Sequence, residues 1–232
     1  MVYKRDACPE CGACSFMGTA STMQVMAEAL GIALPGSALI PTHIHALKEM
    51  AHQASQRATK LAKEELKPSD IMTVKTFENA IMVHAAIAGS SNSLLHLPAI
   101  AHELDIQIPP KLFDEIHRKI PFLLNIRPSG FWPGEYFWYA GGVPAIMEEI
   151  RKFLHLDVLT ITGKTLGENL EELKQNGFYE RCRKNLPALG VKASGIIKPV
   201  GSPIKTQGAI AILKGNLAPE GAVVKHAVSH RN

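Results

Sequence analysis

The chain has 232 residues, of which 46% are hydrophobic and 20% are charged, and its formal net charge is +4. This composition excludes a disordered chain, and the length predicts one large or two small globular domains. Lysine and arginine are scattered, and we find neither a signal-like segment nor an apolar run of membrane-spanning length, so we expect a cytoplasmic protein without a nucleic-acid or membrane partner.

Three cysteines near the start of the chain, Cys8, Cys11 and Cys14, follow a C-x2-C-x2-C spacing. Such a spacing can direct several thiolates at one metal centre, and iron–sulfur clusters are held by thiolates. Gly18 stands where a ferredoxin-type run has its fourth cysteine, and a zinc site would need a fourth ligand such as Cys182 or a distant histidine. The alternative is that these cysteines pack as small hydrophobic residues, whereas a disulfide framework is not expected.

A helix is expected directly after the cysteines, from an N-cap at Thr19 to about Leu30. Met23 and Met26 would share one apolar face of this helix. Cys14 would then lie just before the helix N-terminus, where unpaired N–H groups and the helix dipole favour a thiolate. A thiolate is the form of cysteine that binds a metal.

The rest of the sequence predicts further helices, followed by a segment that contains strands. Apolar residues recur at helical spacing, which predicts helices at about 43–65, 75–88, 94–104, 110–119 and 144–154. Strands are expected at 157–162, 196–200, 208–213 and 222–228, with a turn at 218–221 and a helix from Thr165 to about residue 175. The fold class is therefore α/β, mostly helical in the N-terminal two thirds and with strands in the C-terminal third.

Two patterns are interpreted as ordinary structure. Residues 162–165 read Thr-Gly-Lys-Thr between a predicted strand and a predicted helix, but a phosphate-binding loop needs glycine at the position of Val158. His84, His96 and His102 lie in apolar helical stretches. We expect them to be hydrogen-bonded core residues rather than ligands.

Several stretches, taken in order, resemble the dihydroxy-acid dehydratase and phosphogluconate dehydratase family. These stretches are 11–23, which contains Cys11-Gly12-Ala13-Cys14, then 28–31, 35–37, 77–80, 88–92, 95–97, 140–144, 162–166, 215–219 and 223–225. The resemblance covers nearly the whole chain. Residues 83–102 look closer to the sugar-acid, xylonate-type branch than to the branched-chain amino-acid branch.

The resemblance implies a hydro-lyase that removes water from a 2,3-dihydroxy acid or sugar acid to give a 2-keto-3-deoxy acid. In the family an iron–sulfur cluster, either 2Fe–2S or 4Fe–4S, is the Lewis acid for the departing 3-hydroxyl. Magnesium holds the carboxylate and 2-hydroxyl, and a base removes the C2 proton. Members of the family form homo-oligomers.

The resemblance also assigns residues. Cys14 maps onto a cluster cysteine of the family, whereas Cys8 and Cys11 are further candidates from spacing alone. A substrate-binding loop is implied at Ser90, Ser91 and Asn92, for which helix capping is the alternative. A different class of function, a small metal-binding or interaction module, would use all three N-terminal cysteines as one local site.

The sequence also departs from the family pattern. The other cluster cysteines, the magnesium-binding acids and a modified lysine correspond to family segments before Val2, and the base corresponds to a segment beyond Asn232. We therefore expect residues 1–205 to be part of the N-terminal, cluster-binding domain and residues 206–232 to be the truncated start of the C-terminal domain. Such a chain would be inactive alone and poorly stable as a monomer, with apolar faces at 81–87 and 94–100 uncovered.

Within the matched region, Ala88 replaces the first glycine of the family's Gly-Gly-Ser-Thr-Asn stretch and should perturb a tight backbone.

Overall fold

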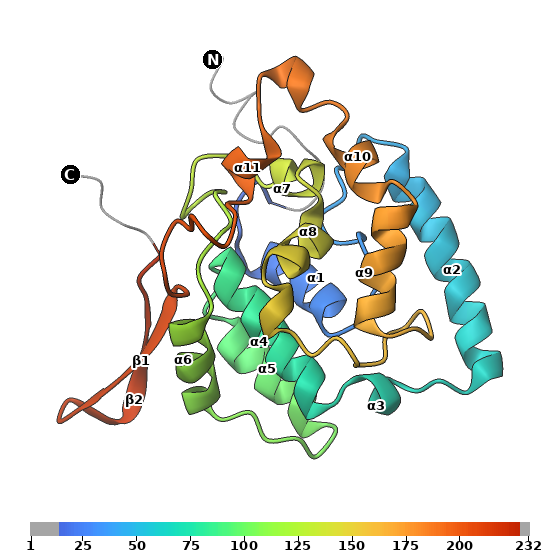
Figure 1. Cartoon of the computed structure of the whole chain (residues 1–232). Helices are drawn as coiled ribbons and strands as arrows, with labels where there is room; N and C mark the ends of the chain where they lie inside the picture. The colour runs from blue at the N-terminus through green and yellow to red at the C-terminus, as the bar shows by residue number, and fades with distance from the viewer. Residues whose placement is uncertain (1–13, 228–232) are drawn as a thin grey trace, which may run out of the picture.

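The computed structural model describes residues 14–227, which form a helical body with a two-stranded antiparallel sheet near the C-terminus (Figure 1). In chain order the elements are α1 (Thr19–Ala29), α2 (Ala46–Glu64), α3 (Pro68–Ile71), α4 (Val74–Ile87), α5 (Ser93–His102), α6 (Pro110–Lys119), α7 (Glu135–Tyr139), α8 (Gly142–Glu149), the 3-10 turn η2 (Arg151–Phe153), α9 (Leu166–Gln175), α10 (Phe178–Arg183), the 3-10 turn η3 (Pro187–Leu189), α11 (Ala193–Ile196), β1 (Ile210–Gly215) and β2 (Ala218–Lys225). The predicted α/β class, with helices first and strands last, is confirmed.

Helix α4 lies at the centre of the core, where it contacts α1, α6 and α8. Phe77, Ile81 and Val83 of this helix have no exposed surface, and its alanines allow the neighbouring helices to approach closely. The apolar face that the sequence predicts to be uncovered at 81–87 is therefore buried within this chain. On α5 the expectation holds for Leu95, which is 69% exposed.

Local sequence signals set several helix ends as predicted. Pro110 begins α6 at a position where a missing N–H costs nothing. At the start of α9 the N–H of Glu168 donates to Thr165 Oγ1 (3.2 Å), and the Thr165 N–H donates to Glu168 Oε2 (2.7 Å). This reciprocal pair is a capping box, so the predicted start of this helix at Thr165 is confirmed.

Two local predictions in the helical body are wrong. The N-cap of α1 is Gly18 rather than Thr19, which is the first residue of the helix. The segment 157–162 is a tight loop, because the Thr160 N–H donates to the carbonyl of Lys164 (3.0 Å) and leaves only an isolated bridge between Leu159 and Thr165.

The C-terminal third holds two further corrections. Residues 196–200 form no strand, because α11 runs to Ile196 and Ile197 makes a single bridge to Leu124. The turn predicted at 218–221 lies earlier, since Ala218 already begins β2 and pairs with Gly215. The strand predicted at 208–213 is confirmed as β1.

Two elements lie at the edge of the body (Figure 1). None of the residues of α2 is buried. The β1–β2 hairpin contacts α6 through β1, and its tip residue Leu217 is 96% exposed. Among residues 14–227, no helix has the length and apolar character needed to cross a membrane.

Candidate functional site

The segment that carries Cys14 is fixed by backbone hydrogen bonds before α1 begins. The N–H of Gly134 donates to the Ser15 carbonyl (2.7 Å), and the N–H of Met17 donates to the Arg127 carbonyl (2.7 Å). Met17 is buried and anchors the segment, whereas Cys14 is exposed with a free thiol. The chain therefore presents this thiol to solvent on a defined backbone close to the α1 N-terminus.

The loop after α4 docks on the same end of α1. The Asn92 side-chain amide donates to Thr19 Oγ1 (2.6 Å), and Thr19 Oγ1 lies 3.3 Å from Ser90 Oγ. The Ser90 N–H donates to Thr22 Oγ1 (3.0 Å). We call Thr19, Thr22, Ser90 and Asn92 the hydroxyl cluster. Because Ser21 Oγ of α1 also donates to the Cys14 carbonyl (3.4 Å), the Cys14 segment and the hydroxyl cluster share one end of this helix.

Helix capping does not account for the side chain of Asn92. Asn92 occupies the N-cap position of α5 but makes no side-chain cap hydrogen bond, because its amide points to Thr19 instead. Ser91 is exposed, and its carbonyl accepts from the Leu94 N–H (3.0 Å). Ser91 and Asn92 are both exposed, so the loop presents these two residues to solvent.

A tight backbone brings the loop to this position. Ala88 ends α4 in the left-handed region with φ of 51°, where an L-residue with a Cβ is strained. At Gly89, an added Cβ would lie 2.4 Å from His84 Cδ2 and 2.6 Å from His84 Nε2. The backbone strain predicted at Ala88 therefore arises from its positive φ. Gly89 is required at the next position because the His84 imidazole leaves no room for a Cβ.

That imidazole belongs to a buried pair of histidines beneath the hydroxyl cluster. His84 Nε2 lies 2.9 Å from the Ser90 carbonyl, and His84 Nδ1 lies 3.0 Å from Nε2 of His117. Burial lowers the pKa of His84 to about 4, and burial together with the nearby His84 and His226 lowers the pKa of His117 well below 6.5. Both rings are therefore neutral near pH 7.

The prediction of core histidines is confirmed for His84 and wrong for His96 and His102, which are exposed on the solvent side of α5. Sequence reasoning missed His117. The charged neighbours Arg118 and Lys119 predict a solvent-exposed end of α6. The local sequence therefore gives no indication that the His117 ring is buried.

A second buried titratable group lies further along α1. Glu28 Oε1 accepts from the Gly36 N–H (2.6 Å) and Oε2 accepts from the Ala38 N–H (2.8 Å). Burial raises the pKa of Glu28 to about 7, against the opposing effect of these backbone donors. Because both oxygens are engaged by the loop, Glu28 is a structural group that the sequence analysis did not find.

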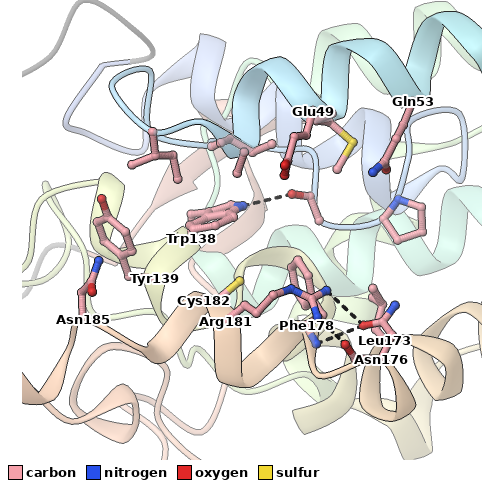
Figure 2. Close-up of a pocket in the computed structure, with 16 residues that line it drawn as sticks. Glu49, Gln53, Trp138, Tyr139, Leu173, Asn176, Phe178, Arg181, Cys182 and Asn185 are labelled. Carbon is pink, nitrogen blue, oxygen red and sulfur yellow. Dashed lines mark hydrogen bonds between the residues drawn. The ribbon is translucent and has the colours of Figure 1, made fainter.

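A cavity of about 400 Å³ is lined by residues of α2, α7, α9 and α10. Trp138 and Phe178 lie on its wall (Figure 2). The Trp138 indole donates to the Gly36 carbonyl (3.0 Å). Cys182 also lines this cavity, and burial raises the pKa of its thiol to about 12. Cys182 is thus a protonated core residue, which makes it a poor fourth ligand for the N-terminal cysteines.

The described residues fit a metal or cluster only in part. Between residues 14 and 227, no three or more His, Cys, Asp or Glu side chains gather in a group that could hold a metal ion. Cys8 and Cys11 lie outside the described residues. Cys14 is accessible and close to a helix N-terminus, so it can supply one thiolate ligand, as expected for a cluster shared with other segments.

Comparison with known proteins decides the family. The sequence profile described as "Dihydroxy-acid/6-phosphogluconate dehydratase N-terminal" matches residues 1–169, and its C-terminal counterpart matches residues 195–232. The chain belongs to the dihydroxy-acid/6-phosphogluconate dehydratase family. The resemblance found in the sequence is therefore confirmed.

Curated relatives in this family include proteins named dihydroxy-acid dehydratase. The one from Caldicellulosiruptor saccharolyticus is 42% identical over 224 residues, which are 96% of this chain and 38% of the relative. "Dihydroxy-acid dehydratase 1" from Methanosarcina acetivorans is 44% identical over 221 residues, which are 95% of this chain and 38% of the relative. The chain thus spans about 38% of the length of these relatives.

Within this dehydratase family the finer assignments stay predictions. They are the domain boundary at 205/206, the cluster role of Cys14 and the substrate role of Ser90, Ser91 and Asn92. What the structure adds is the contact between the α1 N-terminus and the 89–92 loop, which brings Cys14 and the loop residues to one end of one helix.

Proposed function

We propose that this chain forms the cluster-binding and substrate-binding part of a dehydratase, a hydro-lyase that converts a 2,3-dihydroxy acid to a 2-keto acid. The observation that carries the proposal is the meeting of the Cys14 segment and the hydroxyl cluster at the N-terminus of α1. Family membership supports the reaction class, and the curated relatives named dihydroxy-acid dehydratase favour a dihydroxy acid. A sugar acid of the xylonate type is the alternative substrate.

In this proposal Cys14 supplies one thiolate to an iron–sulfur cluster, either 2Fe–2S or 4Fe–4S. The cluster would act as a Lewis acid for the departing hydroxyl group, and Mg²⁺ would hold the carboxylate. The protein's own contribution is hydrogen bonding. The exposed residues Ser91 and Asn92 can bind substrate hydroxyls, while Ser90 and Thr19 fix the loop on α1.

We further propose that the chain alone does not turn over substrate. Of the described residues that hydrogen-bond this loop, His84 is the one with a titratable side chain, and both of its nitrogens are engaged. A base for the C2 proton must therefore reach the loop from elsewhere, and loss of a general base costs several orders of magnitude in rate. The partners expected are the hydroxy-acid substrate and a further copy of the protein in a cytoplasmic homo-oligomer.

The alternative of a small metal-binding or interaction module using Cys8, Cys11 and Cys14 is less well supported. Family membership accounts for nearly the whole sequence, whereas this alternative accounts only for the cysteine spacing. The two proposals differ in which cysteines a bound metal needs. A local site would need all three thiols, whereas the family site needs Cys14 above the others.

Anaerobic reconstitution with iron and sulfide tests the proposal. Visible absorbance of the cluster and bound iron per chain are compared for the wild type, Cys14→Ser and Cys8→Ser, with the buried Cys182→Ser as the matched control. We expect whatever cluster absorbance the wild type gains to be lost with Cys14→Ser and retained with Cys8→Ser. Loss with Cys8→Ser but not with Cys14→Ser would contradict the mapping, and equal loss with both would favour the local module.

A further inference from the structure

A continuous line of buried hydrogen bonds runs from the C-terminal hairpin to the loop of the candidate site. The backbone N–H of Ile210 in β1 donates to His117 Nδ1 (3.1 Å). His117 Nε2 lies 3.0 Å from His84 Nδ1, and His84 Nε2 lies 2.9 Å from the Ser90 carbonyl. His84 has no exposed surface and His117 is 1% exposed, so solvent does not take part.

The two ends of this line fix the position of every proton in it. The Ser90 carbonyl can only accept, so His84 Nε2 carries a proton. The Ile210 N–H can only donate, so His117 Nδ1 carries none. With both rings neutral, His84 Nδ1 accepts from the N–H of His117 Nε2, and each histidine is the Nε2–H tautomer. Protonating His84 would place its Nδ1–H against the Nε2–H of His117. Protonating His117 would place its Nδ1–H against the N–H of Ile210.

A glycine stands against each ring of the pair. An added Cβ at Gly89 would lie 2.6 Å from His84 Nε2, and an added Cβ at Gly208 would lie 2.5 Å from His117 Nδ1. The Gly208 N–H also donates to the His117 carbonyl (2.7 Å). Backbone therefore approaches both ends more closely than a side chain would allow, which limits how far either ring can turn.

We propose that His84 and His117 are positioning residues that couple the placement of β1 to the placement of the 89–92 loop. His84 and His117 lie in the part of the chain matched by the N-terminal family profile, and Ile210 lies in the part matched by the C-terminal profile. The pair thus connects the loop to the first strand of the other matched region. A shift of β1 is transmitted to the Ser90 carbonyl and from there to Thr19 and Thr22 on α1.

The substrate role of the loop rests on the function proposed above, whereas the coupling does not require it. Absence of a cluster or of substrate binding would therefore count against the proposed function and leave the coupling intact. The coupling is tested by measurements on the chain itself that need neither cofactor nor turnover.

Two substitutions of His117 form a matched pair that separates its two hydrogen bonds. In His117→Asn the amide oxygen can replace Nδ1 and accept from Ile210, but contact with His84 is lost. In His117→Gln the amide nitrogen can replace Nε2 and donate to His84, but the acceptor for Ile210 is lost. Both variants remove ring volume from the same place, so a purely packing role predicts faster exchange at core amides such as that of Ile81 as well.

Hydrogen exchange of two backbone amides reports the outcome. Exchange at Ser90, whose N–H is bonded to Thr22, and at Ile210 is expressed relative to the core amide of Ile81 in the same variant. If the pair couples the two ends, loss of either hydrogen bond is felt at both, so we expect each variant to speed exchange at Ser90 and at Ile210 by about tenfold relative to Ile81. Faster exchange at Ser90 alone in His117→Asn and at Ile210 alone in His117→Gln would show two independent hydrogen bonds and would overturn the coupling, as would rates at both amides that do not change relative to Ile81.

Ring-nitrogen NMR of the wild type provides a second test that does not depend on variants folding. Long-range proton–nitrogen spectra distinguish the two neutral tautomers. We expect both His84 and His117 to be neutral with the proton on Nε2. A proton on Nδ1 of either ring would break the line of hydrogen bonds and overturn the proposal.

Discussion

Glu28→Gln should change how the stability of this chain depends on pH. Burial raises the pKa of Glu28 from 4.5 to about 7. The folded state therefore binds this proton more tightly than the unfolded state does. The contribution of Glu28 to stability is complete below about pH 4.5 and is lost as the pH rises through 7.

The size of this effect follows from the shift in the pKa. A rise from 4.5 to about 7 corresponds to about 3 kcal/mol at about 1.4 kcal/mol per pKa unit. The side-chain amide of the variant does not titrate, so subtracting the variant's stability from that of the wild type isolates the carboxyl group. This difference should fall by most of that amount between pH 5 and pH 8.

Urea unfolding followed by tryptophan fluorescence provides the measurement, since Trp138 hydrogen-bonds the Gly36 loop that Glu28 holds. Glu220→Gln, at an exposed position of β2, is the matched control substitution. The backbone N–H donors act against burial by favouring the carboxylate. A difference that stays flat or rises with pH would mean that these donors outweigh burial, and would refute the reasoning.

Four further outcomes are expected. Gly89→Ala should destabilise the chain by about 1–3 kcal/mol in urea unfolding because its Cβ meets the His84 ring, whereas Gly215→Ala, with open space around it, should change stability little. Burial lowers the pKa of His84 from 6.5 to about 4, so the contribution of His84 to stability is complete above pH 6.5 and is lost as the pH falls through 4. The His84 ring should therefore stay neutral at pH 5.5 by NMR. Protonation of the ring at that pH would contradict the burial argument. The wild type should self-associate in light scattering through exposed apolar residues, and Leu217→Ser should reduce this association without lowering the unfolding midpoint; a sharp wild-type monomer peak would contradict the expectation. The chain alone should not convert dihydroxy-isovalerate, xylonate or phosphogluconate to a 2-keto acid, and turnover at ordinary enzyme rates would contradict this expectation.

Elements with a local cause could be predicted from the sequence. Pro110 and the Thr165–Glu168 capping box each act within one turn of helix, so the residues that decide the outcome are neighbours in the chain. The strand predicted at 157–162 failed because an apolar run forms a strand only where a partner strand exists. Thr160 instead bonds Lys164, four residues away.

The candidate site could be predicted only in its parts. Resemblance to a family pointed to Cys14 and to the loop from Ser90 to Asn92, and both lie at the α1 N-terminus. The contact that joins them, from Asn92 to Thr19, spans 73 residues, and the contact between His84 and His117 spans 33. Contacts over such separations depend on how helices pack, for which a single sequence carries no direct signal.

Helix α2 has a consequence for how the molecule opens. None of its residues is buried, and its links to the rest of the chain include the hydrogen bond from Arg57 Nε to the Ile161 carbonyl (2.5 Å). The apolar contacts of α2 with the core come from the partly buried Ala46 and Met50 near its N-terminus, so the C-terminal turns of this helix should open more easily than the core around α4. The core around α4 and the 89–92 loop would stay folded while α2 opens.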